Sequence, residues 1–213
     1  MAKRLLLTRA RHDIGNQYLF AYSEEILNEA EGLGWKTDRA EDEKNSKQEV
    51  ESRLNKTNPD FVFFNGHGSE ESIYGHMNEK LIDTGSASIL SGKIVFARSC
   101  SALKKLGKEA VKEGCKAFVG YKGEFLIPRL NAYESRPKQD PVAKPVLEVS
   151  NFVGKLILKG DKVQIAVDAA QRKAADLILK MLTSEEPYHA ATFRALYQNY
   201  STLSFEGNPE ATA

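Results

Sequence analysis

Two apolar stretches decide the fold: FVFFNGHG at residues 61–68 and KIVFARSCS at residues 93–101. Their apolar residues are continuous rather than alternating, which is typical of strands buried on both faces of a parallel sheet. A third run, at residues 116–121, predicts the next strand, and the amphipathic pattern between Cys100 and Gly114 predicts a helix. Because strands and helices alternate, the sequence predicts an α/β sandwich, a mostly parallel sheet flanked by helices in three layers.

The rest of the chain continues this alternation. Strands are predicted at residues 5–7 and 35–40, helices at 17–33, 41–56, 146–159 and 162–182, and an edge segment within 197–209. Residues 126–145 hold four prolines interleaved with basic residues, and we interpret them as an ordered loop or insertion. The predicted organisation is therefore a single domain over residues 1–213.

Composition excludes several classes of function. The 213 residues include 30 Lys plus Arg and 29 Asp plus Glu, a formal net charge of +1, which gives no reason to expect a nucleic-acid or membrane partner. No apolar run is long enough to cross a bilayer, and the N-terminal run is too short for a secretory signal. Two cysteines cannot form a disulfide framework, so we expect free thiols and a cytoplasmic protein.

His67 and Cys100 are the candidate catalytic residues. Each follows the end of its own buried strand, and functional side chains of parallel sheets gather at that edge. A thiol beside an imidazole is the minimal nucleophile–base pair for acyl transfer, and the amides of Gly68 and Cys100 are candidates for an oxyanion hole. A lone cysteine at a strand end is more often a small buried residue. The occurrence of both residues in equivalent positions favours the catalytic interpretation.

These motifs resemble those of the clan that holds caspases, gingipains, clostripain, separase and the bacterial CHAT-type peptidases. In that clan a His-Gly and a Cys at the ends of adjacent strands form a catalytic dyad, as Asn65-Gly66-His67-Gly68 and Ala97-Arg98-Ser99-Cys100-Ser101 would here. The resemblance also includes GCKAFVG at residues 114–120 and LSFEGNP at residues 203–209, where Asn208 replaces the usual Asp. It implies a cysteine endopeptidase acting on peptide or protein substrates.

Departures from the caspase signature narrow the resemblance. The chain reads Arg-Ser-Cys-Ser-Ala around Cys100 instead of Gln-Ala-Cys-x-Gly, and His67 precedes Cys100 by 33 residues rather than roughly 50. Both differences favour the gingipain–CHAT side of the clan over a true caspase.

In this clan, the residues that select the side chain before the cut follow the first strand and the strand after the cysteine. The corresponding substrate-binding candidates here are Asp13, Arg11, Arg98 and Glu124. Asp13 and Glu124 favour Arg or Lys before the cut, whereas an arginine in the pocket would select acidic residues. Period-two alternation places Arg98 on the same side of its strand as Cys100, where it would favour the thiolate or pair with a neighbouring acid.

No metal or cofactor is expected. His67, His76, Cys100 and Cys115 lack the close spacing of zinc ligands, and SGK at residues 91–93 does not fit a phosphate-binding loop. Calcium activation has no sequence signal.

Two other functions stay open: a catalytically silent binding or signalling module of the same fold, and a flavodoxin-like binder of small molecules. The basic residues Arg129, Arg136 and Lys138 of the Pro-rich stretch are candidate self-cleavage sites of an active peptidase. Oligomeric state has no sequence signal.

Overall fold

A central sheet organises the computed structural model, which describes residues 2–183, 185 and 189–213. Within these residues, six strands form one sheet in the order β2-β1-β3-β6-β7-β8. Neighbouring strands are parallel except for β7 and β8, which are antiparallel. The strands are β1 (Arg4–Arg9), β2 (Lys36–Glu41), β3 (Phe61–Asn65), β6 (Ile94–Arg98), β7 (Ala117–Tyr121) and β8 (Leu203–Gly207). The predicted parallel α/β sandwich is confirmed.

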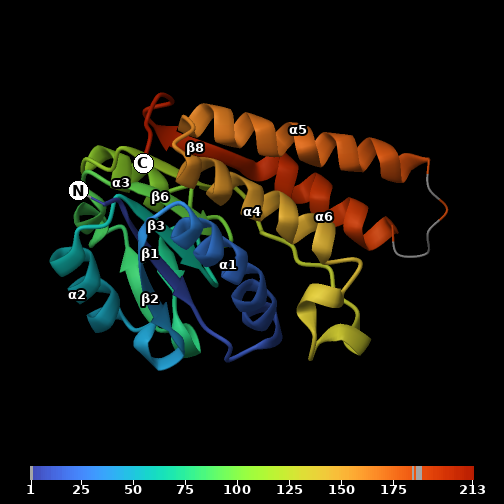
Figure 1. Cartoon of the computed structure of the whole chain (residues 1–213), viewed down its shortest axis with the longest axis horizontal. Coiled ribbons are helices and arrows are strands. Elements are labelled where there is room, and N and C mark those ends of the chain that lie inside the picture. Colours follow the sequence, from blue (N-terminus) through green and yellow to red (C-terminus); the bar gives the residue numbers. More distant parts are fainter. Residues whose placement is uncertain (1, 184, 186–188) are drawn as a thin grey trace.

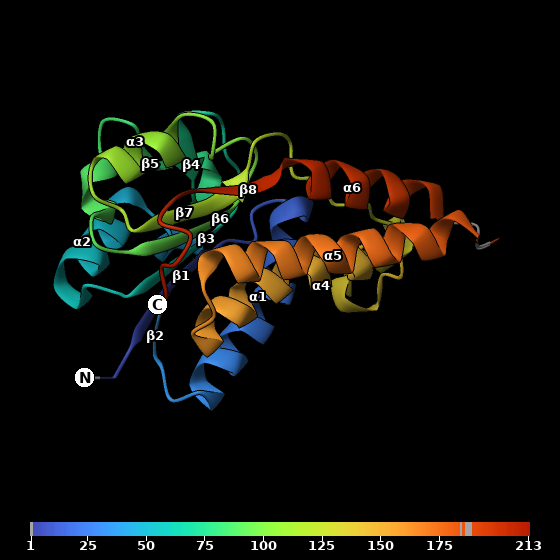
Figure 2. The same ribbon diagram turned by 90° about the horizontal axis from the view of Figure 1, so that it is seen from above.

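Helices cover both faces of this sheet (Figure 1). One face carries α1 (Ile14–Gly32), α4 (Lys144–Lys159), α5 (Val163–Leu182) and α6 (His189–Thr202). The other carries α2 (Lys47–Thr57), α3 (Leu106–Lys112) and a hairpin of β4 (Ser72–Tyr74) and β5 (Lys80–Asp83). Figure 2 shows α5 and α6 side by side, extending well beyond the sheet.

Side chains of the central strands alternate between the two faces of the sheet, and each face has its own core. Phe61 and Phe63 of β3 pack toward α1 and α4, whereas Val62 and Phe64 pack toward α2 and α3. All five residues of β3, β6 and β7 are buried, as the continuous apolar runs predict. The sheet is therefore held from both sides, and its carboxyl edge is a rigid base for the loops that leave it.

Several elements differ from the sequence-based expectation. Helix α2 begins at Lys47 rather than at residue 41, because β2 runs on to Glu41 and Ser46 caps the helix with its hydroxyl. Helix α3 covers only Leu106–Lys112, since turns occupy the residues directly after Cys100. The β4–β5 hairpin and helix α6 are not predicted, and β8 lies at the sheet edge as expected. Among the described residues no helix has the length and apolarity needed to cross a membrane.

The Pro-rich segment is tied to the domain through a buried aspartate. Asp140 is fully buried and accepts hydrogen bonds from the Tyr18 hydroxyl at 2.6 Å and the Leu130 amide at 2.9 Å. Its other oxygen accepts one from the Val142 amide at 3.0 Å. Short 3₁₀ turns at Asn131–Tyr133 and Pro137–Gln139 complete the segment.

Strand order places the site. Helix α1, which follows β1, and the β4–β5 hairpin, which follows β3, cover opposite faces, so the loops after these neighbouring strands diverge. In open α/β sheets such a switch point is where ligands bind. Asp13 follows β1, His67 follows β3 and Cys100 follows β6, all at this edge.

Candidate active site

Asp13 joins the start of α1 to His67. Its backbone is extended, and its Oδ1 accepts a hydrogen bond from the Asn16 amide at 2.8 Å, which caps the helix. Its Oδ2 accepts from Nδ2 of Asn16 at 2.7 Å and lies 2.7 Å from Nε2 of His67. When Nε2 donates to this carboxylate, Nδ1 of the imidazole is left as the proton acceptor.

The carboxyl group of Asp13 is held in its charged form. Burial raises its pKa, but the hydrogen bonds from Asn16 and His67 outweigh burial and keep the pKa below the ordinary value of 3.8. The sequence places Asp13 among the substrate-binding candidates, whereas in the structure its carboxylate is occupied by His67.

Cys100 lies just beyond β6, where the chain turns sharply. The next residue, Ser101, has a φ of +56°, a left-handed conformation that is uncommon outside glycine, and its amide donates to the Gly123 carbonyl at 2.8 Å. The Cys100 sulfur is half-buried and accepts a hydrogen bond from the Phe125 amide at 3.4 Å. Burial raises the pKa of this thiol, the Phe125 amide lowers it, and Glu124 adds a small increase. The resting group at neutral pH is therefore the thiol.

Two backbone amides in the loops that carry His67 and Cys100 lack acceptors among the described residues. Gly68 sits opposite Ile73, and the hydrogen bonds on either side of it come from the Ser69 and Tyr74 amides. Within the described residues, the N–H groups of Gly68 and Cys100 donate to no protein atom. The Gly66 amide, by contrast, donates to the Arg98 carbonyl at 3.4 Å.

The loop after β3, which carries His67 and Gly68, is in close contact with the loop after β6, which carries Ser99 and Cys100. A Cβ atom on Gly68 would lie 2.8 Å from the carbonyl oxygen of Cys100 and 2.8 Å from both Cβ and Oγ of Ser99. Only glycine allows the two loops to approach this closely.

His67 and Cys100 line the same cleft, of about 280 Å³. Its lining is mainly apolar and is completed by Gly15, Leu19, Gly66, Ser99, Phe125, Leu126, Ile127 and Arg129. No acidic side chain belongs to this lining, as far as the structure describes the chain. The one cation, Arg129, is exposed, and its Nε lies 3.8 Å from Glu134.

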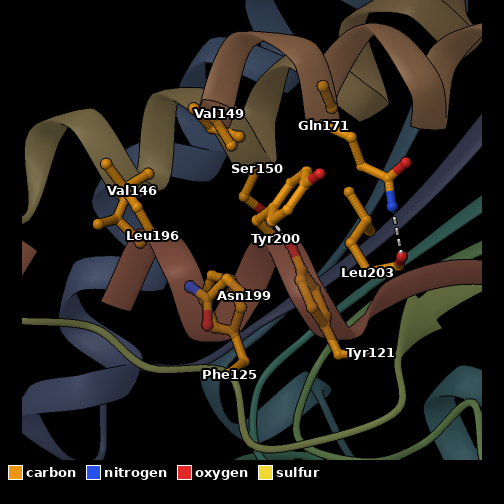
Figure 3. A pocket seen from close by; sticks show the side chains of 12 residues that line it. Tyr121, Phe125, Val146, Val149, Ser150, Gln171, Leu196, Asn199, Tyr200 and Leu203 are labelled. Atoms are coloured by element: carbon orange, nitrogen blue, oxygen red, sulfur yellow. Dashed lines mark hydrogen bonds between the residues drawn. The ribbon is translucent and has the colours of Figure 1, made fainter. Parts of the chain in front are cut away.

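Helix α6 holds one wall of the cleft in place. The Asn199 side chain accepts a hydrogen bond from the Leu126 amide at 2.8 Å and donates one to the Leu126 carbonyl at 2.9 Å. Behind this wall Tyr121, Phe125, Asn199 and neighbouring side chains enclose a cavity of about 10 Å³, room for at most one water molecule (Figure 3). Neither Phe125 nor Asn199 is predicted from the sequence. Asn199 lies in a distant helix, and its local sequence does not indicate that it pairs with Leu126.

Arg98, one of the predicted substrate-binding residues, does not reach the cleft. Its side chain shares the face of β6 with Cys100, as the alternation predicts, but it is fully buried beneath α1 and α4. Its guanidinium donates to Asn65 Oδ1 and Asn151 Oδ1, each at 2.7 Å, and to the Leu19 carbonyl at 3.3 Å. It pairs with no carboxylate of the described chain. Burial lowers its pKa to about 10, so it stays charged at neutral pH.

Arg11 and Glu124 lie outside the cleft lining. The Arg11 guanidinium pairs with Asp42 and stacks on the Phe20 ring, 4.3 Å from its centroid. Glu124 is exposed on the loop after β7. The zinc ligands considered from the sequence are not brought together either, since Cys115 is buried in the core beside α3 and its thiol donates to the Lys93 carbonyl at 3.2 Å.

The chain is similar to known proteins in its three-dimensional structure. Neither protein-family models nor curated proteins match the chain. The crystal structure of the Arg-specific cysteine proteinase gingipain R matches with a TM-score of 0.63 and 12% identity, covering 99% of this chain and 47% of that one. The chain has a caspase–haemoglobinase-like fold.

Two further structures share this caspase–haemoglobinase-like fold. A complex of the pro- and mature domains of RgpB from Porphyromonas gingivalis matches with a TM-score of 0.62 and 11% identity, covering 98% of this chain and 47% of that one. A structure described as a protease matches with a TM-score of 0.53 and 14% identity, covering 99% and 48%. The chain thus spans about half the length of the structures it matches. The predicted resemblance to the clan that holds caspases and gingipains is confirmed for the fold.

Proposed function

We propose that the chain is a cysteine endopeptidase in which Cys100 is the nucleophile and His67 the acid–base group. The observation that carries this proposal is the shared cleft: both side chains line it, and the hydrogen bond from His67 Nε2 to Asp13 leaves Nδ1 as the base. The fold shared with cysteine proteinases is consistent with the same reaction.

The proposed reaction begins with the thiol, because burial raises the pKa of Cys100. Its proton passes to Nδ1 of His67 as the sulfur attacks the peptide carbonyl carbon. The resulting oxyanion accepts hydrogen bonds from the free amides of Gly68 and Cys100, and each such donor is typically worth about 10²–10³ in rate. The C–N bond then breaks, and His67 returns the proton to the leaving amine. Water, deprotonated by His67, hydrolyses the thioester and restores the thiol.

Asp13 is a positioning residue in this proposal. Its carboxylate fixes the imidazole orientation and favours the tautomer with the proton on Nε2. The same carboxylate would also stabilise the imidazolium that forms when the thiol is deprotonated.

For the side chain before the cut, the geometry does not support the basic preference expected from Asp13 and Glu124. One of these carboxylates is held by His67, and the other does not line the cleft. We propose an apolar side chain instead, because Leu126 and Ile127 form the wall beyond Cys100. Arg129 at the same cleft makes an acidic side chain the second choice.

The alternative is a catalytically silent binding module of the same fold. The raised pKa of the Cys100 thiol favours it, because no cation among the described residues offsets the effect of burial on this pKa. Either function suits the reducing, cytoplasmic setting that we propose from the two free cysteines.

Cleavage of a fluorogenic peptide library, varied at the residue before the cut, separates the two functions. Wild type and Cys100→Ala are compared under reducing conditions, with and without calcium. Cleavage by wild type alone supports the peptidase, and the preferred residue tests the apolar wall. If wild type cleaves nothing and a cysteine-reactive peptide probe fails to label Cys100, the silent module is favoured. Mass spectrometry of active protein then shows whether the exposed Arg129, Arg136 or Lys138 is cut.

A further inference from the structure

Beside the cleft, two imidazoles converge on one carboxylate oxygen. Oδ2 of Asp13 lies 2.7 Å from Nε2 of His67 and 3.3 Å from Nε2 of His12. One ligand atom from each of His12, Asp13 and His67 lies within 4.8 Å of the other two. The ring of His76 packs edge-on against the ring of His12, with centroids 5.5 Å apart, and His76 does not belong to this group of candidate ligands.

The His12 side chain lacks good hydrogen-bond partners. Its side chain is only 7% exposed, and its Nδ1 is buried without a partner. Its Nε2 faces an oxygen that already accepts hydrogen bonds from Asn16 at 2.7 Å and from His67 at 2.7 Å. A carboxylate oxygen has two lone pairs, so it offers no free acceptor to this third nitrogen. The other neighbour of His12 Nε2 is Nδ2 of Asn16, 3.5 Å away, and so long a contact leaves the Nε2 lone pair open to a cation. A buried imidazole aimed at a filled carboxylate oxygen points to a missing cation.

The spacing suits zinc. Zn²⁺ binds imidazole nitrogen and carboxylate oxygen at about 2.0–2.2 Å in tetrahedral geometry, which sets ligand atoms about 3.3 Å apart. The His12–Asp13 distance of 3.3 Å already has this value. The His67–Asp13 distance of 2.7 Å must widen by about 0.6 Å, which His67 can provide because its side chain is half exposed. Two imidazoles and one carboxylate are a donor set that zinc commonly takes.

We propose that His12 Nε2, Asp13 Oδ2 and His67 Nε2 form a zinc site that switches the peptidase off. Zinc takes the Nε2 lone pair of His67 and displaces the proton from that nitrogen. The neutral ring then carries its proton on Nδ1, so the nitrogen that should accept the thiol proton becomes a donor. Inhibition therefore rests on the proposed function, whereas the binding of zinc does not.

Titration calorimetry of the full chain with ZnCl₂ tests the binding. Wild type is expected to bind one equivalent, and His12→Gln, which keeps most of the side-chain volume, is expected to bind at least about tenfold more weakly. Cys100→Ala and His76→Ala serve as matched controls and are expected to stay within about twofold of wild type. Circular dichroism verifies that each variant folds.

Three results would overturn the site: no heat of binding in wild type, unchanged affinity in His12→Gln, or lost affinity in Cys100→Ala. The last would show that the thiol, not His12, holds the metal. Zinc inhibition of peptide cleavage is measured for wild type and His12→Gln, each against its own metal-free rate, and His12→Gln should need at least about tenfold more zinc than wild type. If wild type binds zinc through His12 but cleaves no peptide, the site stands and only the proposed function fails.

Discussion

Replacing Gly68 with alanine tests the close approach of the loops that carry His67 and Cys100. The new Cβ would lie 2.8 Å from the Cys100 carbonyl oxygen, whereas ordinary contact begins at 3.4 Å, so the loops must separate by about 0.6 Å. Two of the three opposing atoms, this oxygen and Ser99 Cβ, cannot rotate away. A misplacement of about 1 Å can cost about 10²-fold in rate, so kcat/KM for the best library peptide should fall by about tenfold or more.

Gly107→Ala is the matched control for this substitution. Its Cβ would meet Leu103 Cδ1 at 2.9 Å and Phe118 Cδ1 at 3.0 Å, a similar clash in the core beside α3. Each variant should lose up to about 1–3 kcal/mol of stability by thermal unfolding, with helix propensity offsetting part of the loss in Gly107→Ala. Only Gly68→Ala should also slow labelling of Cys100 by a peptidyl chloromethyl ketone. Equal kcat/KM in the two folded variants would refute the reasoning.

Three further outcomes follow from charges and burial around the site. Asp13→Asn should lower kcat/KM by about 10–100-fold, part of what acid–base catalysis supplies. The pKa of Asp13 is lower in the folded state, so its contribution to stability is present at neutral pH and is lost as the pH falls below about 3.8. The unfolding free energies of wild type and Asp13→Asn should therefore converge in acid. A difference between them that persists there would contradict this. Arg98→Met should lower the free energy of unfolding, measured by chemical denaturation, by about 2–6 kcal/mol. Two buried amide oxygens lose their donors, at about 1–3 kcal/mol each. A change below about 1 kcal/mol would argue against the hydrogen bonds described. One equivalent of iodoacetamide should alkylate Cys100 and leave Cys115, which is 4% exposed and has a pKa raised to about 12, and peptide mass spectrometry would expose the opposite order.

The sequence by itself determined the class of fold, and it pointed to the two residues on which the proposed function rests. Continuous apolar runs read as strands buried on both faces because burial and side-chain period are local properties of the chain. Since His67 and Cys100 each follow such a run, their meeting at one sheet edge was predictable before any partner was known.

Only the tertiary structure decided which side chains surround that pair. Asp13 is 54 residues from His67 and Asn199 is 73 residues from Leu126, and neither pairing leaves a local pattern. The alternation placed Arg98 on the face of Cys100, but whether that face opens to solvent depends on α1 and α4, which cover it. Contacts between distant segments depend on how helices cross the sheet, and periodicity within one segment carries no information about that packing.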